Sequence, residues 1–187
     1  MSKNYHLKRY AEFSDPLVHK SLKETSKDSS KSPEEFMTAN KISVIDFDQV
    51  KNKYLKERSL YEDNAKSVDA LYMLNNEVLC FTEFKNGDFK ASEIIEKSLS
   101  SVLMFCDITS KDLSYMRENA VFVLVYNGEE KKVETRQIMT KKKAHRAKDK
   151  YSLFGLEHLD GFCFKSIVEI EKSEFDESIY SKGIATY

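Results

Sequence analysis

Several features that would assign a chain to a functional class at once are missing from these 187 residues. There is no GxGxxG motif and no GxxxxGK followed by Ser or Thr, which excludes the usual dinucleotide site and the P-loop. No stretch approaches the roughly 18 uncharged apolar residues of a membrane-spanning helix, and no apolar signal region follows the basic N-terminal residues. We therefore expect a cytoplasmic protein with no membrane partner.

Metal-binding and nucleophilic motifs built on cysteine or histidine are also missing. The three cysteines, Cys80, Cys106 and Cys163, lie among apolar residues and form no CxxC pair, so we expect buried thiols in a reducing compartment, without a disulfide or zinc. The four histidines lie far apart in the sequence and have no serine or cysteine partner at a recognisable elbow. A hydrolase triad is therefore not expected.

Charge is abundant but balanced. A third of the residues are charged and the formal net charge is −1, so any site for a polyanion must be local. The concentrated basic segment is KKKAHRAKDK, residues 141–150. On a helix, its side chains would form one basic face that binds phosphates, although a solvated charged helix is the alternative. The candidate nucleic-acid-binding residues are Lys141, Lys142, His145, Arg146 and Lys148.

The length fits one domain with a proper core. Residues 21–35 are almost wholly polar, which is typical of a loop or linker. We therefore predict an N-terminal extension and polar linker over residues 1–40, followed by a single α/β domain over residues 41–187.

Hydrophobic periodicity predicts alternating helices and strands in that domain. Helices are expected at 46–61, with Asp46 as N-cap, at 92–106, at 133–150 and after residue 173; strands are expected at 68–74, 77–85, 120–128 and 161–170. The continuously apolar 120–128 is typical of a central strand. The order predicts an α/β (α+β) fold with a mixed central sheet flanked by helices.

The strand EVLCFTEFK, residues 77–85, ends in two charges, Glu83 and Lys85. Other acid-any-Lys triplets occur in the chain, but these two end an apolar strand, where residues two apart share a face. Burying such charges is costly unless they are paired or bind a metal. An ion pair at a strand end is one interpretation, and a cation site is the other.

A cation site needs further oxygen ligands, and Asp69 is the first candidate. A two-residue turn at Asn75 and Asn76 would place Asp69 opposite Thr82, on the wrong face, whereas a three-residue loop or a bulge would place it opposite Glu83. The cation hypothesis thus predicts an irregular hairpin.

Two positions on the flanking helices each allow two interpretations. Glu57 follows Val50 by two helical turns, so it could face the sheet as a fourth group, or it could be a solvated border residue. Lys97 lies four residues after Glu93, which favours a surface ion pair over an auxiliary basic role in a site.

Together, Asp69, the hairpin, Glu83-Phe84-Lys85, an amphipathic helix and a buried strand resemble the PD-(D/E)xK nuclease superfamily over residues 46–127. The resemblance implies a restriction-endonuclease-like core in which Asp69 and Glu83 bind Mg²⁺ or Mn²⁺, Lys85 positions the attacking water and Glu57 completes the set. Val68 stands where many members have proline, a position that does not ligate the metal.

The function that this resemblance implies is metal-dependent hydrolysis of phosphodiester bonds in DNA or RNA, a phosphoryl chemistry that carboxylate-held cations support. The alternative is a catalytically inactive protein of the same fold that binds protein or nucleic acid. Many members of the superfamily dimerise, and the acidic C-terminal end offers charge for a protein partner, so a homodimer or a protein partner is also possible.

Overall fold

The computed structural model of the protein describes residues 7–75, 78–129 and 152–180. Its centre is a six-stranded sheet with the order β1-β4-β5-β6-β7-β8. These strands are β1 His19–Ser21, β4 Ser43–Asp46, β5 Ala70–Leu74, β6 Val78–Lys85, β7 Ala120–Tyr126 and β8 Ser166–Glu171. Neighbours from β1 to β6 pair antiparallel, and β6, β7 and β8 pair parallel. The predicted mixed sheet is thereby confirmed.

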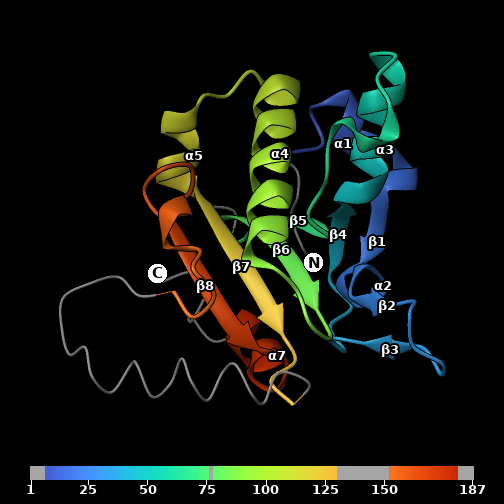
Figure 1. Ribbon diagram of the computed structural model, residues 1–187. Coiled ribbons are helices and arrows are strands. Elements are labelled where there is room, and N and C mark those ends of the chain that lie inside the picture. The colour runs from blue at the N-terminus through green and yellow to red at the C-terminus, as the bar shows by residue number, and fades with distance from the viewer. Residues whose placement is uncertain (1–6, 76–77, 130–151, 181–187) are drawn as a thin grey trace.

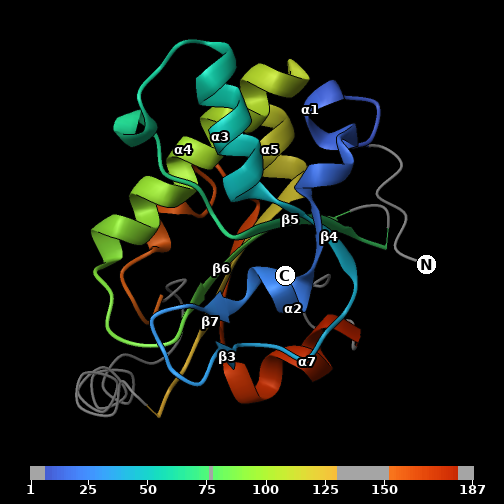
Figure 2. The same cartoon turned by 90° about the vertical axis from the view of Figure 1, so that its right-hand side faces the viewer.

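Helices cover both faces of this sheet, as the two ribbon views show (Figures 1 and 2). One face carries α1 Ala11–Ser14, α3 Phe47–Glu57, α4 Ala91–Thr109 and α5 Leu113–Asn119; the other carries α2 Leu22–Thr25 and α7 Lys172–Tyr180. Short 3-10 turns lie at Pro16–Val18, Glu62–Asn64 and Glu157–Leu159. No helix within the described ranges is long and apolar enough to cross a membrane.

Aromatic rings fill the core beneath α3 and α4. Phe81 of β6 lies edge-on to Phe105 of α4 and to Phe164, with ring centroids 5.6 and 5.5 Å apart. Phe13 of α1 stacks on Phe105 at 5.9 Å. Such pairs add to the stabilisation from buried area, so the N-terminal helix belongs to the same core as the central strands.

The opposite face of the sheet has its own core, in which Phe84 of β6 packs edge-on against Phe175 of α7 at 5.6 Å. Because β6 is covered on both faces, all its residues from Leu79 to Phe84 are buried, Glu83 included. The apolar strand β7 is buried along its whole length, as its composition predicts.

The N-terminal segment differs from the expected extension and linker. Strand β1 pairs with β4, and α2 begins at a capping box in which Ser21 and Glu24 satisfy each other's backbone N–H groups. Leu22 is fully buried against the sheet. The polar run after it contains the hairpin of β2 Lys27–Asp28 and β3 Glu35–Phe36. Apolar spacing does not reveal these elements because α2 buries a single side chain and β1, β2 and β3 have only half-buried and exposed residues.

Helix and strand ends also differ slightly from the prediction. The Asp46 cap of α3 is confirmed, with its carboxylate accepting from the N–H groups of Asp48 and Gln49. Helix α4 begins earlier than predicted, at Ala91, and β8 spans Ser166–Glu171 rather than 161–170. The helix predicted over 133–150 lies outside the described residues.

Candidate functional site

The β5–β6 hairpin sets the position of the site. Leu74 pairs with Val78, which leaves three residues between the strands, and Ala70 pairs with Thr82. Continuing this register places Asp69 opposite Glu83, and the Asp69 N–H donates to the carbonyl of Thr82 at 3.1 Å. The three-residue alternative for residues 75–77 is therefore confirmed, and the two carboxylates share one face of the sheet.

A backbone hydrogen bond holds the Asp69 carboxylate in place across the hairpin. The N–H of Phe84 donates to Asp69 Oδ2 at 2.6 Å, and the side chain keeps 18% of its surface exposed. Burial first, and the nearby charge of Glu83 second, raise the pKa of Asp69 well above its ordinary range. Asp69 is thus a fixed carboxyl group in a crowded, partly desolvated position.

Glu83 is fully buried, and its two oxygens have different surroundings. Oε1 lies 2.7 Å from Lys97 Nζ and 2.9 Å from Lys85 Nζ. Oε2 is buried and has no hydrogen-bond partner among the described residues. A buried carboxylate normally uses both oxygens, so Glu83 retains one acceptor for another group.

Lys97 joins the two acids from the helix above. Its Nζ lies 2.7 Å from Glu83 Oε1 and 3.7 Å from Asp69 Oδ1. Although burial disfavours the charged ammonium, the two carboxylates hold the pKa of Lys97 above its ordinary value. The surface pair with Glu93 that the sequence favoured is wrong, because the basic side chain of α4 points into the site. Two carboxylates and two ammonium groups therefore form one cluster.

A helical acid whose charge acts on this cluster is Asp48, which the sequence pattern does not single out. Asp48 lies in the first turn of α3, its carboxylate hydrogen-bonds the Ser67 hydroxyl, and its charge raises the pKa of both Asp69 and Lys97. Glu57 ends the same helix, exposed, about 15 Å along the axis from its first residue. The structure therefore brings Asp69, Glu83 and Lys85 together but leaves Glu57 apart.

A cavity of about 510 Å³ opens beside the cluster, with Asp69 and Lys85 in its wall. Polar and charged side chains of the segment before β3 line its opposite side. The full lining is Thr25, Ser26, Lys27, Asp28, Ser29, Ser30, Lys31, Met37, Asp69, Phe84, Lys85, Asn86, Gly87 and Asp88. A polar ligand in this cavity would contact the end of β6.

Asn86, directly after β6, ties the two sides of this cavity together. Its Nδ2 donates to Asp28 Oδ2 at 3.0 Å and to Glu35 Oε2 at 2.7 Å, and its Oδ1 accepts from Asn127 Nδ2 at 2.8 Å. The β2–β3 hairpin is thereby fixed to the ends of β6 and β7. The N-terminal segment is part of the site wall, which composition alone could not indicate.

Asp69 and Glu83 are the residues that could hold a divalent cation. Within the described ranges, no group of three or more His, Cys, Asp or Glu side chains is arranged around a common metal position. Mg²⁺, however, is usually held by one or two carboxylates and completes its shell with water and substrate phosphates. Two carboxylates on one face, one with an unused buried oxygen, fit that requirement.

The predicted nucleic-acid-binding residues Lys141, Lys142, His145, Arg146 and Lys148 lie outside the described residues. No protein-family model matches the chain, and neither a curated protein nor a solved structure shows a significant match to it. The evidence for the class of this protein is therefore its own fold and the geometry of its site.

Proposed function

We propose that the protein is a metal-dependent nuclease-like enzyme of the PD-(D/E)xK type that hydrolyses phosphodiester bonds of DNA or RNA. The observation that carries the proposal is the register that places Asp69 opposite Glu83, with Lys85 beside them at the wall of a polar cavity. An ion pair confined to the end of β6 would need only Glu83 and Lys85.

Asp69 and Glu83 would hold Mg²⁺ or Mn²⁺, which when bound neutralises charge on the phosphate and makes a nearby water more acidic. Lys85 lies in the cavity wall, and its ammonium has three hydrogen-bond donors. These are enough to maintain the contact with Glu83 and also to orient a water or a phosphate oxygen. The water oxygen gives up a proton to solvent and bonds to phosphorus as the P–O bond to the leaving oxygen breaks, and the leaving oxygen takes a proton from solvent. Phe84 assists by fixing Asp69 through its N–H.

The basic segment 141–150 remains the sequence-based proposal for contacts with the nucleic-acid backbone. Because the net charge is −1, that segment would have to supply most of the phosphate attraction. Neutralising Lys141, Lys142 and Arg146 together should weaken binding to every nucleic acid and flatten its salt dependence, as measured by fluorescence anisotropy at several salt concentrations.

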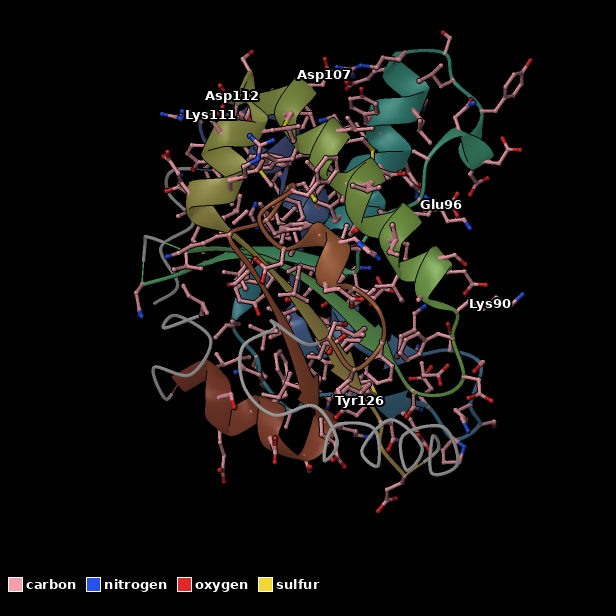
Figure 3. The ribbon with its side chains drawn as sticks, turned by 60° about the vertical axis from the view of Figure 1, so that its left-hand side comes forward. Lys90, Glu96, Asp107, Lys111, Asp112 and Tyr126 are labelled. Carbon is pink, nitrogen blue, oxygen red and sulfur yellow. The ribbon has the colours of Figure 1, made fainter. Side chains whose placement is uncertain are left out.

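Cleavage assays test the enzymatic proposal. The protein is incubated with plasmid, linear duplex and single-stranded DNA and with RNA, in Mg²⁺ or Mn²⁺ and in EDTA. Cleavage should require the metal and disappear in Lys85→Ala but persist in Lys90→Ala, which removes an exposed lysine at the start of α4 (Figure 3). Metal-dependent cleavage that survives Lys85→Ala, or no cleavage of any substrate, contradicts the proposal.

A non-catalytic binding module is the second candidate, and the pairing of the charges favours it. Both ammonium groups contact Glu83, so the four charges already cancel without a cation. Such a module would bind nucleic acid or a protein with equal affinity in Mg²⁺ and in EDTA and would cleave nothing. Binding measured beside the cleavage assay distinguishes the two candidates.

A further inference from the structure

The Lys97 ammonium lies where a cation would meet the two acids. It is 2.7 Å from Glu83 Oε1 and 3.7 Å from Asp69 Oδ1, and it is the described lysine that contacts both. Lys85 contacts only Glu83 among these acids. A divalent ion bound by both carboxylates would therefore adjoin the Lys97 charge.

Like charges at that separation repel strongly. The repulsion is stronger in a partly buried protein setting than in bulk water, and a divalent ion doubles one of the two charges. A cation and the Lys97 ammonium thus compete for the same two carboxylates. A strong contact between Lys97 and these carboxylates therefore lowers the affinity for the cation.

Lys97 is able to leave this position. Its side chain keeps 23% of its surface exposed, and a lysine stem has four flexible carbons. Asp48, whose charge acts on Lys97, lies exposed at the start of α3 and offers the ammonium a third acidic neighbour besides Asp69 and Glu83. A shift of the flexible Lys97 side chain toward Asp48 would keep its charge near an acid.

We propose that Lys97 is an internal counter-ion that occupies the cation position between Asp69 and Glu83 and must be displaced before a divalent metal binds there. The inference rests on the proposed metal site. Its consequence is that the protein alone binds the metal weakly, and that a substrate phosphate, which brings negative charge, favours the exchange. Lys97 is thus a residue that sets metal affinity rather than one that ligates the metal.

Direct measurement of Mn²⁺ binding, by electron paramagnetic resonance of the free ion without nucleic acid, tests the proposal. Lys97→Met keeps the length of the side chain and removes the charge, so Mn²⁺ should bind it roughly tenfold more tightly than wild type. Lys97→Arg keeps the charge and should stay within about twofold of wild type.

The matched control is Lys66→Met, which removes an exposed lysine that pairs with Glu96 on the outer side of α4 (Figure 3). Its affinity should also stay within about twofold of wild type, because exposed charges are screened. Adding Asp69→Asn to Lys97→Met should remove the tight binding.

Thermal unfolding gives a second measurement that does not need accurate affinities. Mn²⁺ should raise the Tm of Lys97→Met more than that of wild type, since the ion replaces the lost counter-ion. If Lys97→Met does not fold, Lys97→Gln is used and the same order is expected.

The outcomes separate the two proposals. The counter-ion role of Lys97 is overturned if Lys97→Met binds Mn²⁺ as tightly as wild type or more weakly. The metal site still stands in that case if Asp69→Asn abolishes Mn²⁺ binding. Absence of binding in every variant overturns both. Tighter binding by Lys66→Met as well would show a general charge effect and also overturns the specific role of Lys97.

Discussion

Strands β6 and β7 are neighbours that differ in composition although the interior of β6 and all of β7 are buried. They pair in parallel, so Glu83 lies beside Leu124 and Lys85 beside Tyr126. Every residue of β7 is buried and none is charged, whereas β6 places a fully buried carboxylate at the same level of the sheet. Leu124 demonstrates that an apolar side chain satisfies the fold at this level.

The charges of β6 are therefore an addition that the fold does not require. Desolvating a carboxylate is costly, and the cost is offset only by good partners. Those partners come from two elements: Lys85 from β6 itself and Lys97 from α4. The N–H of Phe84, also in β6, holds the opposing Asp69 carboxylate. A strand that keeps such an arrangement beside an apolar neighbour is typical of a functional site.

The largest expected effect is a difference in cleavage rate between a variant of β6 and a variant of β7. Glu83→Gln should reduce metal-dependent cleavage by about a thousandfold or more, because it removes an ionised ligand that acts on the reacting phosphate. Leu124→Val, beside it on β7, should keep the rate and cost about 1 kcal/mol of unfolding free energy. An equal loss of cleavage rate in both variants would mean that the substitutions unfold the protein. Far-UV circular dichroism of both variants checks whether they are folded.

The second prediction concerns stability. Lys97→Met should lower the free energy of unfolding by about 2 kcal/mol, because Glu83 loses one of two partners and remains buried. Lys66→Met removes a pair with Glu96 in which both side chains are about half exposed, and should cost less than about 1 kcal/mol. Urea unfolding of both variants checks the order, and the reverse order would contradict a buried pairing role for Lys97.

Making β6 resemble β7 gives a third prediction. The double variant Glu83→Leu with Lys97→Met removes the buried pair together, so its stability should equal that of wild type or exceed it by up to about 2 kcal/mol. Cleavage should be absent. The single variants should each be less stable than the double, with a coupling free energy of about 1–3 kcal/mol in the cycle. Additive losses would mean that the pair does not act as a unit.

The sequence indicates the central strands clearly because their apolar, β-branched composition is typical of buried strands. The run AVFVLVY can only be a buried strand or a buried helix segment, and its length and β-branched residues favour the strand. The sequence leaves the hairpin register open between two loops, since Asn75 and Asn76 suit either. Asn75 adopts a positive φ of 52° in the observed loop. Packing of the paired strands, which local sequence does not contain, selected the longer one.

Lys97 was misplaced for a different reason. In the predicted helix 92–106, the apolar residues Ile95, Leu99, Val102 and Cys106 recur at helical spacing and predict the inward face. At 100° per residue, Lys97 lies about 140–180° away from them. The buried face instead includes Ile94, Ser98 and Ser101. Small serines let the helix approach the sheet but count as polar in a hydrophobicity pattern. That rotation brings Lys97 toward Glu83.

The smallest expected effect compares the two ends of α3. Glu57→Gln should change the activation free energy of cleavage and the free energy of unfolding by less than about 0.5 kcal/mol each. Glu57 is exposed and lies far along the helix from the site. Asp48→Asn removes a charge that acts on both Asp69 and Lys97, so it should change the cleavage rate by a few-fold, about 1 kcal/mol in barrier. Single-turnover kinetics of the two variants at fixed Mg²⁺ measures the difference. A larger effect at Glu57 than at Asp48 would mean that the end of α3, and not its start, adjoins the reacting groups.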